Sequence, residues 1–301
     1  MKRVVLTGAT GAIGTALTQL LVDEGLEVLV LTRADSKRNN RIIKNPNVRV
    51  LESDFSDLDS VENDTGVDWD YFFHFAWAGA SGEGRNDMFL QNNNVKMALS
   101  AVALAKRFGC KKFIGAGSQA EYGRHSEKLT PETPTFPENG YGYAKLCTSF
   151  MTRDYAHQLG LEQNWLRILS VYGPNDGVNS MMNQVVNSLK EGKSLDLTKG
   201  EQIWDYVYSK DAARAFYAVA ENGIDGKVYV LGSDDERPLA DYLNAVRDIV
   251  APNVQLNLGA RAYGENQVMY LAADSSELIK DTGYSPKYSF EDGILDMLKA
   301  E

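Results

Sequence analysis

The chain has 301 residues, 44% of them apolar and 24% charged, which is the composition of a folded protein with one large domain or two medium ones. The net charge of −10 argues against a nucleic-acid-binding protein that relies on a basic surface. No run of about 18 apolar residues occurs, so we expect neither a membrane span nor a signal peptide. Only two cysteines are present, Cys110 and Cys147, which excludes a disulfide scaffold and favours a cytoplasmic location.

Short β-branched runs alternate with longer helical patterns through the first half of the chain. Continuous apolar strands separated by helices predict a parallel sheet covered on both faces, a doubly wound α/β fold of the Rossmann type. The predicted strands span 3–7, 27–32, 48–52, 71–76, 112–116 and 164–169, and two of the predicted helices span 12–24 and 88–108.

The pattern changes after about Gly173, where helical segments are mixed with very short strand candidates and turn signals. We interpret 1–173 as a dinucleotide-binding domain and 174–301 as mainly a smaller C-terminal α/β lobe, with a segment around 203–231 returning to the first domain. Later helices are predicted at 178–189, 210–220, 239–250 and 290–298, and strands at 195–197, 228–231 and 254–258.

A glycine-rich run follows the first predicted strand and opens the first predicted helix. Gly8 permits a tight turn, Gly11 lets the backbone approach a pyrophosphate, and Gly14 permits close packing of helix on strand. In this context the Gly-x-x-Gly-x-x-Gly spacing predicts a dinucleotide site; a turn that serves packing alone is the alternative. The predicted cofactor contacts in this run are Gly8, Thr10, Gly11, Ala12, Ile13 and Gly14.

The end of the second predicted strand distinguishes NAD from NADP, because an acidic residue there binds the ribose 2′-hydroxyl whereas an arginine accommodates a 2′-phosphate. Segment 33–44 holds five basic residues and one acidic residue. This favours NADP(H) over NAD(H), with Arg33 and Lys37 as contacts; a solvated basic loop is the alternative. Asp54 and Phe55 follow the third strand, as candidates either for contacting the adenine or for forming a turn.

A catalytic group is predicted where Tyr141 and Lys145 stand four residues apart on one helical face. A phenol with a pKa of about 10 is a poor base, and we expect the neighbouring Lys145 ammonium to lower the pKa of Tyr141. Ser118 follows the fifth predicted strand, at the edge where open α/β sheets bind ligands, so it is expected to hydrogen-bond the reacting substrate oxygen.

With these motifs the chain resembles the extended short-chain dehydrogenase/reductases, the group of nucleotide-sugar epimerases, dehydratases and reductases. The matching segments extend over nearly the whole chain and include the glycine-rich run, Asp54, 74–76, 94–95, Ser118 with 122–123, Tyr141 with Lys145, 167–174 and 202–211.

The resemblance implies hydride transfer at a sugar carbon, usually C4, of a nucleotide-sugar. It also implies a homodimer formed through the helices at 88–108 and 141–160; the alternative is that their apolar residues only cover the sheet. It places cofactor contacts at Phe75, Ala76, Trp77, Asn94, Tyr141 and Lys145, and substrate contacts at Ser118, Asn179 and Gln202.

Several positions depart from the family pattern. Dehydratases of this group carry Asp-Glu after the Ser/Thr, whereas this chain has Gln119 and Ala120, so 4,6-dehydration is disfavoured unless Glu121 shifts into register. Gln119 is instead a candidate substrate contact. Ser170 and Trp204 replace a usual Asn and Arg, and Arg261 is the candidate substitute for a diphosphate-binding arginine.

These features favour an NADPH-dependent 4-keto-sugar reductase, because NADPH is the usual donor for reduction. An NAD-dependent nucleotide-sugar 4-epimerase is the first alternative, and a non-catalytic NADP-sensing module is the second. The three histidines, His74, His125 and His157, lie far apart without ligand spacing, so we expect no metal.

Overall fold

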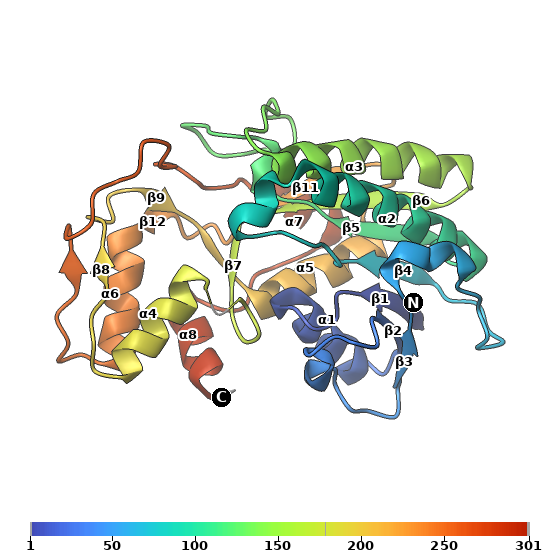
Figure 1. Cartoon of the computed structure of the whole chain (residues 1–301), viewed down its shortest axis with the longest axis horizontal. Coiled ribbons are helices and arrows are strands. Elements are labelled where there is room, and N and C mark those ends of the chain that lie inside the picture. The colour runs from blue at the N-terminus through green and yellow to red at the C-terminus, as the bar shows by residue number, and fades with distance from the viewer. Residues whose placement is uncertain (1, 178, 300–301) are drawn as a thin grey trace.

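The computed structural model describes residues 2–177 and 179–299, and its centre is one sheet of seven parallel strands (Figure 1). The strand order reverses between β1 and β4, and ligands of open α/β sheets bind at the carboxyl ends of the strands beside such a point. The order across the sheet is β11 (Val228–Leu231), β6 (Glu162–Ile168), β5 (Lys112–Ala116), β4 (Tyr71–His74), β1 (Arg3–Thr7), β2 (Glu27–Thr32) and β3 (Val48–Glu52).

Successive side chains of a strand point to opposite faces of the sheet. Both faces of this sheet are apolar, and helices cover both of them. Phe73 of β4 packs into one apolar cluster and Phe72 into another. The first cluster joins the sheet to α1 (Ala12–Asp23), α5 (Ser209–Asn222) and α7 (Ser276–Thr282). The second joins it to α2 (Met88–Arg107) and α3 (Gly140–Gln158).

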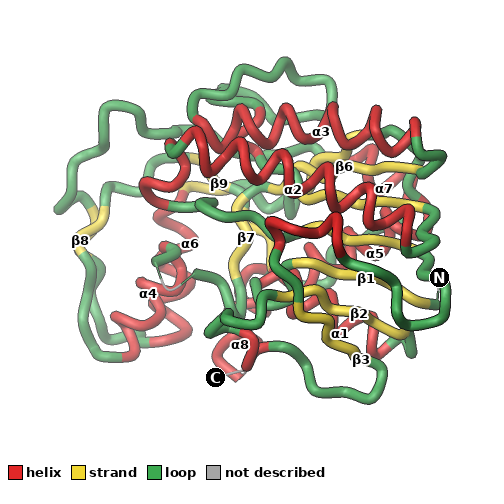
Figure 2. Tube along the Cα trace, turned by 45° about the vertical axis from the view of Figure 1, so that its right-hand side comes forward, coloured by secondary structure: helices red, strands yellow, loops and turns green. Residues whose placement is uncertain are grey.

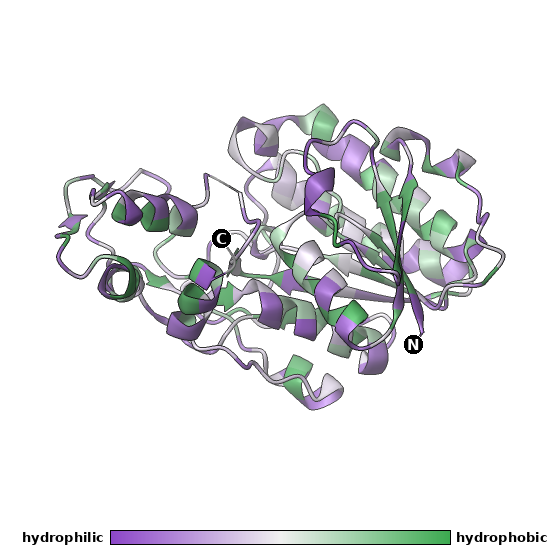
Figure 3. Cartoon of the chain, turned by 90° about the horizontal axis from the view of Figure 1, so that it is seen from below, coloured by the Kyte–Doolittle hydropathy of each residue, from purple (hydrophilic) through white to green (hydrophobic). Residues whose placement is uncertain are grey.

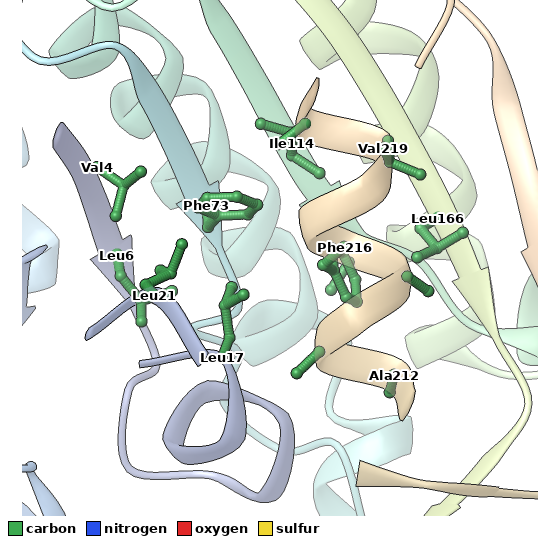
Figure 4. Close-up of a cluster of buried hydrophobic side chains, with 14 of the residues drawn as sticks. Val4, Leu6, Leu17, Leu21, Phe73, Ile114, Leu166, Ala212, Phe216 and Val219 are labelled. Carbon is green, nitrogen blue, oxygen red and sulfur yellow. The ribbon is translucent and has the colours of Figure 1, made fainter. Parts of the chain in front are cut away.

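The first cluster shows how segments far apart in sequence share one core. In Figure 4, Leu17 and Leu21 of α1 and Phe216 of α5 surround Phe73 of the sheet. All four side chains are fully buried. Figure 3 shows the matching pattern of hydropathy, with apolar strands inside and helices whose outer sides are polar.

The second lobe contains three helices and short paired strands beside the sheet (Figure 1). Its core contains a group of aromatic rings, in which Tyr206 and Phe290 each contact both Tyr172 and Tyr242. The helices are α4 (Met181–Lys190), α6 (Leu239–Val250) and α8 (Phe290–Lys299). The strand pairs are β7 (Ser170–Tyr172) with β10 (Tyr206–Tyr208), β9 (Ile203–Trp204) with β12 (Arg237–Pro238), and β8 (Asp196–Leu197) with β13 (Asn257–Leu258).

In the described part of the chain, four short 3₁₀ helices join the larger elements: η1 (Asn39–Arg41), η2 (Phe55–Ser60), η3 (Gly82–Asn86) and η4 (Gln119–Glu121). No described helix is long and apolar enough to cross a membrane.

The predicted Rossmann fold with a smaller C-terminal α/β lobe is confirmed, while several element bounds differ from the predictions. The strand predicted at 71–76 ends at His74, because the next two N–H groups turn toward the Thr7 hydroxyl. The strand predicted at 254–258 has only two residues, and the helix predicted from Val178 begins at Met181; Val178 lies outside the described residues. Within 203–231, α5 and β11 pack into the sheet layers, as does the later helix α7.

Candidate active site

The glycine-rich turn between β1 and α1 contains two glycines that the packing of the chain itself requires. Gly8 has a φ of 78°, and a Cβ there would lie 2.7 Å from the Phe75 carbonyl carbon. A Cβ on Gly14 would collide with the Gly8 carbonyl oxygen. Gly11 differs, because the nearest atom to a Cβ there is 3.7 Å away, so any requirement for glycine at this position comes from a bound molecule.

The same turn is suited to a pyrophosphate. Gly11 caps α1 without a side-chain hydrogen bond, so N–H groups of the first helical turn have no side-chain partner at the cap. These groups and the positive end of the helix dipole attract anions. The turn therefore fits the phosphates of a dinucleotide.

A cavity of about 510 Å³, which we call the crevice, opens beside this turn at the carboxyl edge of the sheet. Its size suits a cofactor site. The predicted cofactor residues that line it are Gly8, Thr10, Gly11, Arg33, Asp54, Phe55, Phe75, Ala76, Trp77 and Asn94. The predicted residues outside its lining are Ala12, Ile13, Gly14, Lys37, Tyr141 and Lys145.

One rim of the crevice is basic. Arg33, Ser36 and Arg38 line it, whereas Lys37 is exposed outside the lining. Asn39 holds this turn in shape, since its side chain accepts a hydrogen bond from the Thr32 hydroxyl at 2.7 Å and donates one to the Arg33 carbonyl at 2.8 Å. Ser36 and Arg38 were missed by the sequence analysis, although the predicted basic segment contains both.

Asp54 forms the turn that was proposed for it, and its contact with the adenine stays a prediction. Its carboxylate accepts a hydrogen bond from the Ser56 N–H at 2.9 Å and caps η2, and it also lines the crevice. Hydrogen bonds from Ser56, and then the Arg33 guanidinium, hold the pKa of Asp54 below its usual value. The Asp54 carboxylate is therefore held in its charged form where it lines the crevice.

Ser118, Tyr141 and Lys145, which we call the buried trio, come together at the end of β5. Ser118 and Tyr141 are both buried, and the Ser118 side chain lies close enough to the phenol to lower its pKa. The Lys145 ammonium donates to the Ala116 carbonyl at 2.6 Å and lies 3.7 Å from the centre of the Trp77 ring. Since Trp77 also lines the crevice, this ring is where the crevice and the buried trio adjoin.

The prediction that the Lys145 ammonium lowers the pKa of Tyr141 is wrong for this arrangement. Burial raises the pKa of Tyr141, and the opposing influences are the nearby Ser118 side chain and the charge of Arg85. The Arg85 guanidinium lies 4.4 Å from the centre of the Tyr141 ring, whereas the Lys145 ammonium is 5.8 Å from it. Burial also lowers the pKa of Lys145 to about 7, against the influence of the Glu121 carboxylate.

The loop that carries Trp77 and Arg85 is fastened to α2. Asn94 exchanges two hydrogen bonds with the Ala78 backbone, each 2.9 Å long. Gln91 accepts from the Trp77 indole at 2.9 Å and donates to the carbonyls of the loop. Gln91 and Arg85 were missed because no local motif marks them; Gln91 is a polar residue on the buried face of a helix.

Glu121 is turned into the protein and does not line the crevice. The side chain is fully buried and accepts hydrogen bonds from the Ser118 N–H at 2.8 Å and the Arg167 guanidinium at 2.7 Å. Together Ser118 and Glu121 form a capping box, whose Ser-x-x-Glu signature is visible in the sequence and went unused.

The predicted substrate contacts are spread over several elements. Gln119 follows Ser118 directly and is half-buried. Asn179 is exposed before α4, and Arg261 is exposed beside β8, with its N–H donating to the Leu197 carbonyl. Gln202 is buried before β9, and its Oε1 has no hydrogen-bond partner among the described residues.

His74 is the buried histidine nearest to this site. The Thr7 hydroxyl receives the N–H groups of Phe75 and Ala76, so its own proton goes to His74 Nδ1 at 3.0 Å. His74 Nε2 therefore carries the ring proton, without a partner among the described residues. Burial lowers the pKa of His74 to about 3, so the ring is neutral. In the described part of the chain no three His, Cys, Asp or Glu side chains are grouped to hold a metal.

The sheet order, the glycine-rich turn and the second lobe together are those of an extended short-chain dehydrogenase/reductase. The model of the family described as "NAD dependent epimerase/dehydratase family" matches residues 4–232. The chain therefore belongs to this family of nucleotide-sugar enzymes.

Individual relatives are distant but extend over the whole chain. CDP-abequose synthase of Salmonella typhimurium is 24% identical, over 98% of this chain and 97% of its own. UDP-glucose 4-epimerase of Corynebacterium glutamicum is also 24% identical, over 95% and 92%. Among solved structures, UDP-N-acetylglucosamine 4-epimerase of Methanobrevibacter ruminantium has a TM-score of 0.87 at 23% identity, covering 99% of this chain and 97% of its own. UDP-glucuronic acid 4-epimerase of Bacillus cereus, solved with NAD, has a TM-score of 0.84 at 22% identity, covering 99% of both chains.

Proposed function

We propose that this protein reduces the C4 ketone of a nucleotide-activated sugar with NADPH. The observation that carries the proposal is the buried Tyr141 phenol, with the Ser118 side chain and the Lys145 ammonium beside it, next to a crevice with a basic rim. A buried phenol whose pKa is raised keeps its proton at neutral pH, as a general acid in a reduction must.

The residues of the crevice fit the cofactor. The glycine-rich turn would hold the pyrophosphate, and Asp54 would face the adenine end. Arg33 and Arg38 with Ser36 would hold a ribose 2′-phosphate, for which arginine offers paired donors. Lys37, predicted as a contact, would serve only as a more distant charge.

The buried trio would carry the proton chemistry. When bound, the nicotinamide would supply the hydride. Tyr141 would donate its proton to the C4 oxygen, and Ser118 would hydrogen-bond that oxygen as negative charge develops. Lys145, in its charged form, would stabilise Tyr141 once the phenol has lost its proton.

The same geometry disfavours 4,6-dehydration. Gln119 and Ala120 supply no acid or base, and Glu121 uses both carboxylate oxygens inside the protein. A nucleotide-sugar 4-epimerase remains the second candidate, supported by the relatives named 4-epimerase. The intact buried trio argues against a module that only senses NADP.

A panel of nucleoside diphosphate 4-keto-sugars, assayed with NADPH and NADH, tests the proposal. We expect NADPH to be consumed with at least one of them, and the Tyr141→Phe variant to lose about 10³-fold in kcat while still binding NADPH. Interconversion of 4-epimers without net consumption of NADPH would replace the reductase with an epimerase. Binding of NADPH without any turnover would support the alternative that the protein is a module that only senses NADP.

We also propose that the protein forms a homodimer through α2 and α3, which lie side by side (Figure 2). Helix α3 exposes large apolar side chains, Tyr143, Phe150 and Met151, and Phe89 of α2 is 86% exposed. Such a patch is typical of an interaction surface. Light scattering after size exclusion is expected to give twice the mass of the chain, and the double variant Phe150→Glu with Met151→Lys is expected to give a monomer.

A further inference from the structure

A buried ion pair lies behind Ser118, and the proposed chemistry makes no use of it. Glu121 and Arg167 are joined at 2.7 Å, and their side chains are 0% and 5% exposed. Removing two charges from water costs several kcal/mol per ion, and well-packed apolar residues often replace such pairs without loss of stability. Stability alone therefore does not explain why this ion pair is present. Its position beside the buried trio points to a functional reason.

Glu121 determines where Ser118 lies. Its Oε1 accepts from the Ser118 N–H at 2.8 Å, while the Ser118 hydroxyl accepts from the Ala120 N–H at 3.2 Å. These bonds hold both the backbone and the side chain of Ser118 in one orientation. In that orientation the hydroxyl lies close enough to the Tyr141 phenol to lower its pKa.

The end of β5 is shaped to admit this carboxylate. The Trp165 indole of β6 donates to Glu121 Oε1 at 2.9 Å, above two glycines of the neighbouring strand end. A Cβ on Gly115 would run into the Trp165 ring, and a Cβ on Gly117 would lie 2.7 Å from Glu121 Oε1. Both glycines therefore make room for a tryptophan and a carboxylate rather than for a bound molecule.

We propose that Glu121 is a positioning residue that acts on two members of the buried trio: it orients Ser118 through the backbone, and it is the counter-charge of the Lys145 ammonium. The catalytic meaning of this inference rests on the proposed function. Arg167 and the Trp165 indole hold the carboxylate in place, so that it stays charged in a buried position.

Lys145 approaches Glu121 at Trp165: its ammonium lies 5.8 Å from the centre of the Trp165 ring, and the indole N–H of that ring donates to the Glu121 carboxylate. The electrostatics of the pocket agree with this geometry. Burial lowers the pKa of Lys145 to about 7, and Glu121 raises it. Glu121 also raises the pKa of Tyr141. The carboxylate therefore favours the protonated form of both residues, which is the form that reduction requires.

The other charged or titratable groups around the pocket do not change charge near neutral pH. Arg85 faces Tyr141 from η3, and Arg167 lies behind Glu121 on β6; both guanidinium groups remain charged. His74 of β4 is neutral, because its pKa is lowered to about 3. The loss of the Glu121 charge should therefore be visible directly in the titration of Lys145.

The decisive variant is Glu121→Gln, which keeps an oxygen for the Ser118 N–H and removes the charge. Lys145 is titrated by NMR of the protein labelled with ¹³C at the lysine Cε, with its resonance assigned from Lys145→Met. We expect the Lys145 pKa to fall by about one unit or more in the variant. The alkaline limb of kcat for the reduction is expected to move to lower pH by the same amount.

Two further variants separate charge from packing. Trp165→Phe removes one hydrogen bond to Glu121 and keeps the charge, so the Lys145 pKa is expected to stay at its wild-type value. The double variant Glu121→Gln with Arg167→Met removes both charges and avoids an unpaired buried guanidinium, so it tests the inference if the single variant fails to fold. Its Lys145 pKa is expected to fall as in the single variant.

A Lys145 pKa that is unchanged in both charge-removing variants would overturn the inference. So would an equal fall in Trp165→Phe, which would assign the effect to packing. The titration requires no substrate; a Lys145 shift without reduction of any 4-keto nucleotide-sugar would instead count against the proposed function alone.

Discussion

The crevice and the buried trio adjoin at Trp77, yet they are built in different ways. The crevice is lined by several short runs of residues, each close together in sequence, such as the turn after β1 and the basic rim at Arg33 and Arg38. The buried trio consists of side chains held by distant elements, with Glu121 and Arg167 behind it. A phosphate-binding wall can be built from one short run of residues, whereas a pocket that tunes pKa values needs several elements.

The largest effect we expect comes from removing the Tyr141 hydroxyl. This change would disable the buried trio and leave the crevice intact. Tyr141→Phe should lower kcat by about 10³-fold, since a positioned general acid contributes about 10²–10⁴-fold. Because the crevice does not include Tyr141, the affinity for NADPH measured by calorimetry should stay within about twofold. A variant that retains wild-type turnover would remove Tyr141 from the mechanism.

Two alanine variants separate packing from binding within the crevice. Gly8→Ala forces a positive φ and a backbone clash, so urea unfolding should show a loss of about 1–3 kcal/mol or more. Gly11→Ala meets no close atom of the protein, so its stability should change by less than about 0.5 kcal/mol while NADPH affinity falls about tenfold or more. Equal stability losses in the two variants would contradict this division of roles.

The basic rim should decide which cofactor is preferred. Arg33→Ala with Arg38→Ala should weaken NADPH binding about 10- to 100-fold and leave NADH binding unchanged, because only the 2′-phosphate is lost as a partner. Lys37→Ala is the matched control, since Lys37 lies in the same loop outside the crevice. If Lys37→Ala weakens NADPH binding as much as the double variant does, the assignment of Arg33 and Arg38 to the 2′-phosphate is wrong.

The pH dependence of the reduction rate and of folding stability should reflect the titration of Lys145 in the buried trio and not that of a group in the crevice. Lys145 has a folded pKa of about 7 against an ordinary value of 10.5, so reduction should fall about tenfold per pH unit above about pH 7. Between those values the unfolded chain binds more protons than the folded chain. Folding stability relative to Lys145→Met should therefore rise from about pH 7 to pH 10.5. A flat profile for both quantities would show that Lys145 does not titrate there.

Sequence patterns predicted the sheet, most of its strands and the members of the crevice with local motifs, since these depend on periodicity and on turns of a few residues. They did not predict that Arg85 is the cation nearest the Tyr141 ring, because η3 and α3 meet only after folding. Nor did they separate Lys37 from Arg38, because which side chain of an exposed loop faces the crevice is decided by the Asn39 hydrogen bonds.

By itself, the sequence determined the Rossmann architecture, the glycine-rich turn and the presence of Ser118, Tyr141 and Lys145, because each depends on local backbone geometry or on helical spacing. Only the tertiary structure decided the charge environment of those three residues and the inward direction of Glu121. The physical reason is that burial and charge–charge distances arise when β5, β6, α3 and η3 pack together, and no single one of these segments contains that information.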